Sequence, residues 1–264
     1  MKQVVITGST RGIGFGLAKE FLKKGCRVVV SGRSNETVQQ AVLSLIAVSG
    51  SDQARGRACD VTDLEQVQSL WGFAAENNPV DIWINNAGIS HLMTPFYQIS
   101  AETRVKVLNT NLLGMMNGSS VAIQKMQQQG FGALYNLEGL GSNGMVIKGM
   151  SIYGTSKAAA RYFDKALAEE LQGSNLIIGG LQPGMVLTDM LFDQNETSGE
   201  EWEKKKKIFN FLSERVEKVT PWLVDKILAN RKNGRVIKYS NPVRLFIRML
   251  GVLSGQRDLF KEEK

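Results

Sequence analysis

The sequence has few cysteines and no long apolar run, and each shortage excludes a class of protein. Its 264 residues contain only two cysteines, Cys26 and Cys59, which lie in or beside apolar strand patterns. We therefore expect reduced core thiols of a cytoplasmic protein rather than a disulfide framework. No apolar stretch approaches the roughly 20 residues that a membrane-spanning helix needs. The first apolar strand begins close to Met1, which we take to leave no room for a targeting segment.

The chain also lacks a linker-like run of Pro, Ser and Gly, an internal repeat and a low-complexity tract. A chain of this length can bury a large core, and α/β folds of this size are commonly single domains. We expect one domain over residues 1–264. Within it, 1–190 would form a dinucleotide-binding and catalytic core, and 191–264 a substrate-binding cover with a basic C-terminal region. No metal site is expected.

Basic residues are concentrated in the last quarter. Residues 201–264 contain 16 Lys and Arg against 8 Asp and Glu, a net charge of +8, whereas residues 1–200 contain 16 against 17. Basic and aromatic side chains do not interleave and no nucleic-acid motif is present, so we exclude a nucleic-acid site. An acidic ligand or an anionic surface is compatible with this charge.

What the sequence does contain is an alternation of short apolar runs with helical patterns. Alternation of this kind predicts an α/β fold of Rossmann type: a doubly wound parallel sheet of about seven strands with helices on both faces. Ligands bind at the carboxyl ends of such strands. We expect strands near 3–7, 27–31, 55–59, 80–85, 132–137, 175–181 and 235–238. We expect helices near 12–24, 35–48, 63–77, 101–129, 152–172, 202–218, 221–231 and 242–253.

The first strand runs into a glycine-rich turn, which a helical pattern follows. Glycines let the backbone turn sharply and approach a phosphate, and the N-terminus of the helix presents N–H groups and the positive end of its dipole. With a strand before it and a helix after it, the turn predicts a pyrophosphate cradle rather than a plain tight turn. The cradle consists of Thr7, Gly8, Ser9, Thr10, Arg11, Gly12, Ile13 and Gly14.

The second strand ends at Arg33 without an acidic residue. An Asp or Glu there would bind the ribose hydroxyls of NAD, whereas an Arg can pair with the 2′-phosphate of NADP. We expect Arg11 and Arg33 to converge on that spot and predict NADPH; two solvated arginines are the alternative. Asp60, which precedes Val61 after the third strand, accepts from the adenine amino group or caps the helix opening at 62–63.

Tyr153 and Lys157 stand four residues apart at the start of a long helical pattern. Four residues is just over one helical turn, so the phenol and the ammonium leave the same face of the helix. Because a nearby cation favours phenolate, we expect Lys157 to lower the pKa of Tyr153 and make the phenol a general acid. Alone, the pair also fits a solvated helix, and it gains weight from the glycine-rich turn near the other end of the chain.

Five features in this order resemble those of the short-chain dehydrogenase/reductase family over nearly the whole chain. They are the turn at 7–14, Asn85-Asn86-Ala87-Gly88, Asn111 in a helix, Tyr153 with Lys157, and Pro183-Gly184 with Thr188. The resemblance implies an NAD(P)-dependent enzyme with a seven-stranded doubly wound sheet and a small-molecule substrate. It also implies a homodimer or homotetramer that packs through the helices near 101–129 and 152–172.

The resemblance further implies roles for individual residues. Lys157 would hold the nicotinamide ribose, Tyr153 would protonate the carbonyl oxygen as hydride arrives, and Asn111 would hold a water that resupplies protons. The cofactor carries the hydride. Further residues expected to contact the cofactor are Asn86, Ala87, Gly88, Pro183, Gly184, Val186 and Thr188.

One residue of the family pattern is missing. The family places a Ser thirteen positions before the Tyr, where it binds the substrate carbonyl, and here that position is Leu140. Ser142 or Asn143 replaces it from the glycine-rich loop, Glu138 faces the site, or the site is inactive. In the last case the chain would bind nucleotide without turnover.

This departure resembles one branch of the family, the chlorophyll b reductases. The similar stretches begin at Asn136-Leu-Glu-Gly-Leu-Gly-Ser and at Pro183-Gly-Met-Val-Leu-Thr-Asp, and others lie at 208–212 and 234–244. The resemblance implies NADPH-dependent reduction of the C7 formyl group of chlorophyll b, or of a related tetrapyrrole, to a hydroxymethyl group. We expect a soluble relative that acts on this or another bulky apolar carbonyl, of steroid, retinoid or acyl type.

The C-terminal quarter is expected to build the substrate pocket. Two apolar helical faces there suit either a cover over a flat ligand or ordinary core packing, and the second also suits a membrane or a partner subunit. The first face consists of Ile208, Phe209, Phe211, Leu212, Val216 and Val219, behind the lysines at 204–207. The second consists of Val243, Leu245, Phe246, Ile247, Leu250 and Leu253, with Arg244 and Arg248 one turn apart. His91 lines the pocket or is an ordinary loop residue.

Overall fold

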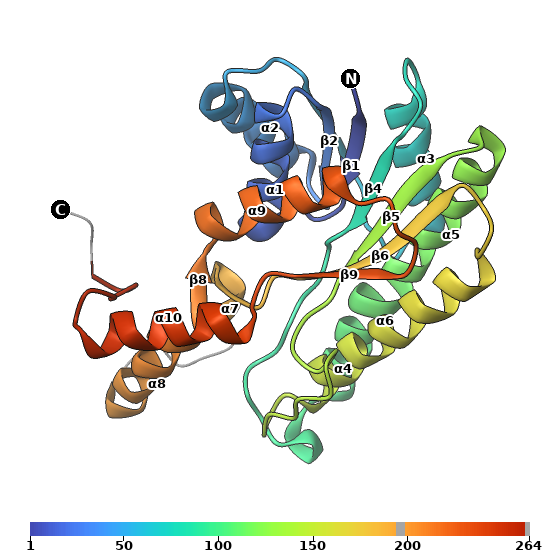
Figure 1. Ribbon diagram of the computed structural model, residues 1–264. Helices are drawn as coiled ribbons and strands as arrows, with labels where there is room; N and C mark the ends of the chain where they lie inside the picture. Colours follow the sequence, from blue (N-terminus) through green and yellow to red (C-terminus); the bar gives the residue numbers. More distant parts are fainter. Residues whose placement is uncertain (194–198, 262–264) are drawn as a thin grey trace.

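The computed structural model describes residues 1–193 and 199–261, and its centre is a seven-stranded parallel sheet (Figure 1). The strand order is β3-β2-β1-β4-β5-β6-β9, so the chain builds outward from β1, returns to pair β4 with β1, and then builds outward the other way. The strands are β1 (Gln3–Ile6), β2 (Arg27–Gly32), β3 (Ala54–Ala58), β4 (Ile82–Asn85), β5 (Gly132–Leu137), β6 (Leu176–Gln182) and β9 (Arg235–Lys238).

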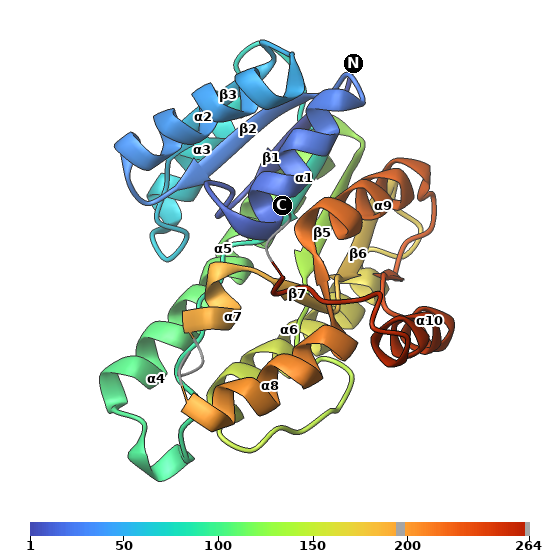
Figure 2. The same ribbon diagram turned by 90° about the vertical axis from the view of Figure 1, so that its left-hand side faces the viewer.

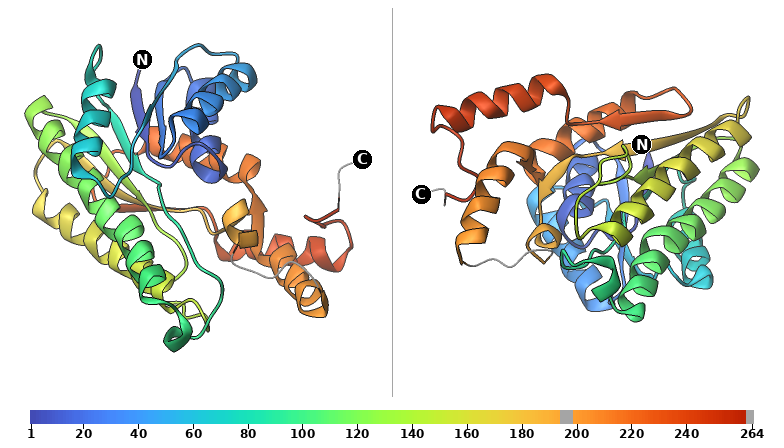
Figure 3. Two further views of the ribbon diagram at one scale, coloured as in Figure 1. Left: turned by 180° about the vertical axis from the view of Figure 1, so that it is seen from behind. Right: turned by 90° about the horizontal axis from the view of Figure 1, so that it is seen from below.

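Helices cover both faces of this sheet. α1, α2 and α9 pack on one face, and α3, α5 and α6 pack on the other (Figures 1 and 3). The helices are α1 (Gly12–Lys23), α2 (Asn35–Ser49), α3 (Leu64–Ala75), α4 (Ala101–Leu108), α5 (Gly114–Gln129), α6 (Ser151–Glu170), α7 (Asp189–Asp193), α8 (Gly199–Leu212), α9 (Val216–Ala229) and α10 (Pro242–Leu253). A 3₁₀ turn, η1 (Phe96–Gln98), precedes α4, and a π-helical turn, η2 (Asn109–Leu113), joins α4 to α5.

The core divides into two layers because side chains alternate along each strand. Val4 and Ile6 of β1 face the layer under α1, α2 and α9, whereas Val5 faces the layer under α3, α5 and α6. In the second layer Trp83 of β4 stacks on Trp71 of α3, with ring centroids 5.7 Å apart. Near-continuous apolar strands are typical of a parallel sheet that is covered on both faces.

All seven expected strands are confirmed, each within two residues of the expected bounds. The two expected core cysteines are also confirmed, because Cys26 and Cys59 are buried free thiols. Burial raises the pKa of both thiols, that of Cys59 to about 12. The helix expected over 101–129 is present, but the turn η2 interrupts it.

A second, two-stranded sheet was not expected. β7 (Met185–Leu187) pairs in parallel with β8 (Ser213–Arg215), so the helix expected over 202–218 is wrong beyond Leu212, and α9 already begins at Val216. Contacts with residues distant in the sequence stabilise β8 as a strand. Glu214 of β8 is buried and pairs with Arg248 and Arg257, and a buried polar strand carries no apolar alternation that the sequence could reveal.

α8 and α10 contact each other, and the view from that side shows α8 below the strands of the sheet and α10 to their right (Figure 2). α10 is turned so that a charged side chain faces inward and apolar side chains face outward. Arg248 is 4% exposed and donates to the carbonyl oxygen of Leu212 over 2.8 Å, whereas Ile247 is 61% exposed. None of the helices within 1–193 and 199–261 is both long and apolar enough to span a bilayer.

Candidate active site

The glycine-rich turn between β1 and α1 is shaped so that a phosphate can approach its backbone. Gly8 and Gly12 both have a φ of +59°, in the left-handed region that favours glycine. A Cβ on Gly8 would lie 2.6 Å from Cα of Ala87, and one on Gly14 would lie 2.7 Å from the carbonyl oxygen of Gly8. No side chain caps α1, and its first turn has no acidic residue. The N–H groups and the positive dipole end of α1 are therefore available to an anion.

Thr7 and Ser9 hold this turn in place. Thr7 Oγ1 accepts from the backbone N–H groups of Asn86 (3.0 Å) and Ala87 (3.1 Å). Asn86 Nδ2 in turn donates to the carbonyl oxygens of Thr7 (2.9 Å) and Gly8 (2.7 Å). Ser9 Oγ donates to the last carbonyl of β1 over 2.6 Å. These bonds fix the turn to the loop that follows β4.

A cavity of about 800 Å³ lies at the carboxyl ends of the strands and brings most of the expected site residues together. This edge, where the chain reverses its building direction between β1 and β4, is where ligands bind in such sheets. Expected residues that line the cavity are Gly8, Thr10, Arg11, Gly12, Ile13, Gly14, Arg33, Asp60, Val61, Asn86, Ala87, Gly88, Ser142, Tyr153, Lys157, Pro183, Gly184, Val186 and Thr188. Thr7, Ser9 and Asn111 do not line it.

Arg11 and Arg33 both line the cavity, as expected. Arg11 Nη1 lies 3.2 Å from Asp189 Oδ2, and the two side chains are 70% and 63% exposed. An ion pair that is so exposed contributes little free energy, so Arg11 can exchange Asp189 for an anionic ligand at little cost.

Asp60 lines the cavity and is not the cap of α3. That cap is Asp63, whose Oδ1 accepts from the backbone N–H of Glu65 over 3.0 Å. Asp60 Oδ1 accepts from the backbone N–H (2.9 Å) and the hydroxyl (2.8 Å) of Thr62, which fixes its carboxylate beside the cavity. The capping alternative for Asp60 is therefore wrong.

Tyr153 and Lys157 lie on the first two turns of α6, and Lys157 Nζ is 5.9 Å from the centre of the Tyr153 ring. Lys157 Nζ donates to the carbonyl oxygen of Leu137, at the end of β5, over 2.9 Å. Burial raises the pKa of Tyr153 to about 12. Burial also lowers the pKa of Lys157 to about 8, against the opposing effect of the Asp164 and Glu138 carboxylates.

The expected lowering of the Tyr153 pKa is thus wrong for the protein alone. Loss of solvation disfavours the phenolate, and Lys157 does not offset it, because its ammonium is directed at Leu137 and is itself desolvated. The phenol is therefore protonated throughout the physiological pH range and can donate a proton.

Asn111 lies in the π-helical turn η2 and is 2% exposed. Its Oδ1 accepts from the backbone N–H of Ile89 (2.8 Å), and its Nδ2 donates to the carbonyl oxygen of Ile89 (2.9 Å) and to Ser156 Oγ (3.1 Å). Asn111 therefore connects the loop after β4 to α6, next to Lys157. Single π-helical turns of this kind are frequent at functional sites. The water-holding role of Asn111 stays a prediction.

The loop after β5 places Gly139, rather than Leu140, against the phenol. A Cβ on Gly139 would lie 2.8 Å from Tyr153 Oη. Leu140, Ser142 and Asn143 line the cavity, and Ser142 Oγ donates to the carbonyl oxygen of Gly139 over 2.7 Å. Gly139, one position before Leu140, thus lies against the phenol, and any side chain at 139 would meet the Tyr153 hydroxyl.

A buried polar cluster lies behind the cavity. The Glu138 side chain has no solvent exposure; its Oε1 accepts from Arg161 Nη1 over 3.1 Å, and its Oε2 accepts from Gln182 Nε2. Asp164 Oδ1 accepts from Asn136 Nδ2. Burial raises the pKa of Asp164 to about 8, and the nearby Glu138 carboxylate acts in the same direction.

Three residues of this cluster were missed. Gln182 is the last residue of β6 and lines the cavity, so its place at a strand end, directly before Pro183, is the signal that could have found it. Arg161 and Asp164 follow Lys157 by four and seven positions. Charged residues at that spacing share a helix face, and a charged face beside a functional lysine was the second signal.

Apolar side chains, four of them methionines, line much of the rest of the cavity. Methionine is unbranched and adapts to irregular ligands. These residues are Leu140, Met145, Met150, Met185, Val186, Met190, Leu191, Leu212 and Leu245. The last four come from the segment after β7, from α8 and from α10, so the C-terminal third contributes to the cavity wall.

The two apolar helical faces expected in the C-terminal quarter differ in how deeply they are buried. Phe209 and Val219 are buried, so core packing holds for them, while Ile208 is 53% exposed. On α10, Leu245 lines the cavity but Phe246 is 55% exposed, so the alternative of a buried helix is wrong there.

His91 does not line the main cavity. It lines an adjoining hollow of about 650 Å³ that shares Arg11 and Arg33 with it. His91 Nδ1 lies 2.7 Å from the carbonyl oxygen of Leu92. Among the described residues, no cluster of three or more His, Cys, Asp or Glu side chains could hold a metal ion.

Comparison with known proteins finds a matching family model and similar curated proteins. Residues 2–199 match the family model described as short chain dehydrogenase. A curated Arabidopsis thaliana protein named "Probable chlorophyll(ide) b reductase NYC1, chloroplastic" is 34% identical over 93% of this chain and 52% of its own length. Rice (Oryza sativa subsp. japonica) "Chlorophyll(ide) b reductase NOL, chloroplastic" is 39% identical over 86% of this chain and 66% of its own length. The chain thus spans about half to two thirds of the length of these relatives.

Solved structures share the fold. A variant of actinorhodin polyketide ketoreductase, crystallised with NADPH, superposes with a TM-score of 0.81 over 90% of this chain and 95% of its own, at 24% identity. An identity this low supports the fold alone.

The expected cytoplasmic location is wrong on these comparisons. Four relatives that match 86% or more of the chain are named chloroplastic, and this finding contradicts the expectation. The cysteine count and the apolar pattern near Met1, on which the expectation depended, do not distinguish one reducing compartment from another.

Proposed function

This chain belongs to the short-chain dehydrogenase family, and we propose that it is an NADPH-dependent reductase of a bulky apolar carbonyl. The substrate we favour is the C7 formyl group of chlorophyll b or of a related tetrapyrrole, which would become a hydroxymethyl group. One observation carries the proposal: a phenol with its neighbouring ammonium, an anion-binding glycine turn and an apolar wall share one cavity of about 800 Å³.

The residues present fit a nicotinamide dinucleotide. Glycines at 8, 12 and 14 leave the turn without side chains, and the uncapped N-terminus of α1 suits a pyrophosphate. The family uses NAD(P)H, and the reduced nicotinamide supplies the hydride. NADPH is favoured over NADH because Arg33 follows β2 where an acidic residue would bind the ribose of NAD, and Arg11 has only an exposed partner.

The protein's own groups would then handle the proton and the charge. Tyr153, kept neutral by burial, donates its proton to the carbonyl oxygen. Lys157 orients the ribose and supplies positive charge that stabilises the phenolate left behind. Ser142 donates a hydrogen bond to the same carbonyl oxygen, and Asn111 holds the loop after β4 against α6.

The identity of the substrate is supported by the cavity wall and by the two named relatives. A wall with four methionines suits a large, flat, apolar ligand. Residues 191–261 are proposed as the substrate cover, since Leu191, Leu212 and Leu245 reach the cavity. A steroid, retinoid or acyl carbonyl would fit the same wall chemistry, so the assay includes them.

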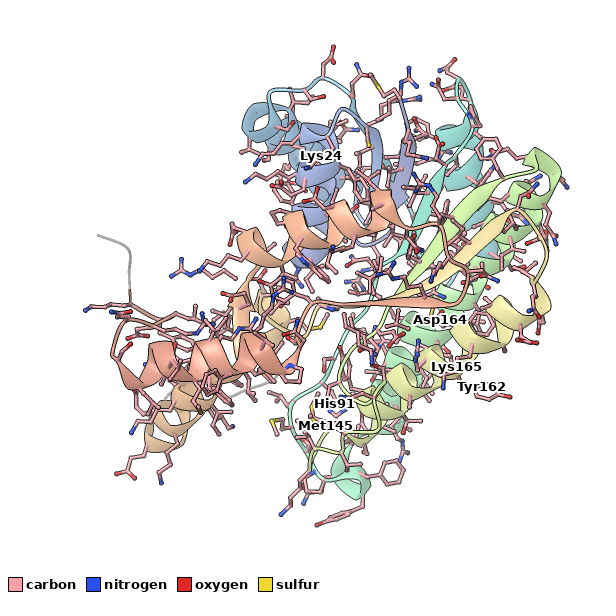
Figure 4. The ribbon with its side chains drawn as sticks, in the orientation of Figure 1. Lys24, His91, Met145, Tyr162, Asp164 and Lys165 are labelled. Carbon is pink, nitrogen blue, oxygen red and sulfur yellow. The ribbon has the colours of Figure 1, made fainter. Side chains whose placement is uncertain are left out.

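The test is reduction of chlorophyll b by the purified protein with NADPH, followed by chromatographic detection of the hydroxymethyl product. Tyr153→Phe should lower the rate by roughly 10²- to 10⁴-fold while NADPH still binds. Tyr97→Phe is the matched control, because Tyr97 is 81% exposed and lines neither hollow. Tyr162, on the outer side of α6 (Figure 4), is kept for the test of the subunit contact. Turnover that Tyr153→Phe leaves unchanged would exclude Tyr153 as the acid.

Two further outcomes are decisive. Tight NADPH binding without reduction of any carbonyl in the panel would favour the nucleotide-binding protein without turnover. Tighter binding of NADH than of NADPH would contradict the role given to Arg11 and Arg33. Under the proposal, Arg33→Ala should weaken NADPH binding at least tenfold and leave NADH binding within about twofold.

The protein is proposed to act as a homodimer or homotetramer that packs through α4, α5 and α6. These helices form the outer layer on one side of the sheet (Figure 3). Large side chains are exposed on that layer, among them Val105 (56%) and Tyr162 (76%).

A further inference from the structure

We infer that Glu138 and Gln182 are positioning residues for Ser142, and that this chain of three side chains replaces the serine missing from the family pattern. The inference rests on the proposed function, in which Ser142 binds the substrate carbonyl. Ser142 comes from the glycine-rich loop after β5, and its hydroxyl is held by hydrogen bonds to Gly139 and Gln182.

Glu138 is anchored as firmly as a side chain in the core. Its backbone N–H donates to Leu181 over 2.8 Å, and its side chain has no exposure to solvent. Arg161 Nη1 lies 3.1 Å from Oε1 and supplies the opposite charge that a buried carboxylate requires. Gly180 makes room for it, because a Cβ there would lie 2.0 Å from Glu138 Oε1. The sheet therefore contains a space that only glycine at 180 leaves open.

Glu138 decides which way the Gln182 amide points. A carboxylate only accepts hydrogen bonds, so the Gln182 group that faces Oε2 must be the NH₂ and not the carbonyl oxygen. The same Nε2 also lies 3.2 Å from Ser142 Oγ. The NH₂ has two hydrogens, and these two contacts use both. Gln182 thus donates to Ser142 as a consequence of the charge on Glu138.

This donation fixes the role of Ser142. With one lone pair of Oγ occupied by Gln182, the hydroxyl hydrogen points elsewhere, and in the structure it points to the carbonyl oxygen of Gly139 over 2.7 Å. A hydroxyl that accepts one hydrogen bond becomes a stronger donor of its own. If the Ser142 side chain rotates, its hydroxyl can donate to an incoming carbonyl oxygen in place of the Gly139 carbonyl oxygen.

Gly139 lies next to the phenol and also accepts the hydrogen bond of Ser142. A Cβ on Gly139 would lie 2.8 Å from Tyr153 Oη, so a serine at 139 would collide with the phenol it should assist. The loop instead delivers Ser142, which bonds to the Gly139 carbonyl and lines the same cavity as Tyr153. Gly139 is therefore next to two hydrogen-bond donors, the Tyr153 and Ser142 hydroxyls.

A double-mutant cycle on the reductase rate tests whether Glu138 and Gln182 act through Ser142. Ser142→Ala should lower kcat about 10²-fold, in the range for losing one donor to a developing oxyanion. Gln182→Met and Glu138→Gln should each lower kcat roughly tenfold in the wild-type protein. In the Ser142→Ala background, the same two changes should cost less than about twofold. A merely structural role predicts instead that the losses multiply, and that result overturns the inference.

Two measurements keep the outcome readable. NADPH affinity should stay near wild type in Gln182→Met, which removes both donated bonds. The thermal midpoint should fall, because Glu138 Oε2 loses its donor, while Arg161 still pairs with Oε1; this variant carries the test if Glu138→Gln does not fold. Ser254→Ala, at the exposed end of α10, is the control for a serine truncation. If Asn143→Ala lowers kcat as much as Ser142→Ala does, the donor is Asn143 and the inference is contradicted. A wild-type protein that reduces no carbonyl refutes the proposed function instead.

Discussion

At the scale of single residues, the site is governed by desolvation. Tyr153, Lys157 and Asp164 are each shifted toward their neutral forms, the phenol upward, the ammonium downward and the carboxyl upward. Perturbed groups of this kind gather at functional sites. Because two of the three pKa values lie near 8, pH is a direct probe of the site.

Lys157 should set the upper pH limit of reduction. Its pKa of about 8 means that the ammonium is charged below pH 8 and neutral above it. Since the positive charge stabilises the phenolate of Tyr153, kcat/KM should be level below about pH 8 and fall above it. Lys157→Met should be slow at every pH and show no such fall. The measurement is kcat/KM for NADPH against pH, which reports the free protein, and a fall that persists in Lys157→Met would assign it to another group.

Asp164 should make the fold less stable as pH rises. Its pKa is about 8 in the folded protein and about 3.9 in an unfolded chain, so between these values the folded state binds more protons. The free energy of unfolding therefore decreases as pH rises from about 4 to 8, and Lys157 adds no slope there, because both its folded and unfolded pKa values lie at or above 8. Asp164→Asn should remove most of the slope. Thermal midpoints measured from pH 5 to 8 test this, and an unchanged slope would contradict it.

At the scale of elements, the short turns carry more of the function than the long helices. Gly8 combines a φ of +59° with a backbone neighbour 2.6 Å from where its Cβ would be, whereas Gly50, with a φ of +67°, has nothing within 4 Å. Gly50→Ala should cost only the left-handed penalty of about 1–2 kcal/mol. Gly8→Ala should cost more, because Ala87 must move as well.

NADPH titration separates the two glycine variants further. Gly8→Ala should weaken NADPH binding at least tenfold, since the turn that meets the pyrophosphate is displaced. Gly50→Ala, at the end of α2 and away from the cavity, should leave it unchanged. If Gly8→Ala and Gly50→Ala lower the denaturant midpoint equally and weaken NADPH binding equally, the turn at Gly8 is not the pyrophosphate site.

The elements also show what could be predicted from the sequence. Apolar runs rich in Val and Ile predicted the central strands β1, β2 and β4, because strands covered on both faces are mostly apolar. The edge strand β3 was predicted too, although its sequence is Ala-Arg-Gly-Arg-Ala. β8 carries no such signal, since Glu214 is stabilised by Arg248 and Arg257 from more than 30 residues away. Tyr153 and Lys157 were predicted because their spacing is local. Gln182 was missed because only the fold brings it to Glu138, 44 residues earlier.

At the scale of the whole molecule, two surfaces compete as the contact between subunits. The outer layer of α4 to α6 exposes Tyr162, and α10 exposes Phe246 and Ile247. We expect Tyr162→Asp to lower the mass measured by light scattering toward that of the 29.1 kDa chain. Phe246→Asp, on α10, should leave it unchanged. The reverse result would place the subunit contact on α10.

The inside-out arrangement of α10 reverses the usual advice for engineering a more soluble variant. Polar replacements at Phe246 or Ile247 remove apolar surface that is more than half exposed, so they should improve solubility and expression yield. Arg248→Leu, which hydropathy alone would recommend for a buried site, would instead remove one of the two arginines that pair with Glu214 Oε2 and the donor to the Leu212 carbonyl oxygen. On this helix, the outward Phe246 and Ile247 can be replaced, and the buried Arg248 is the residue to keep.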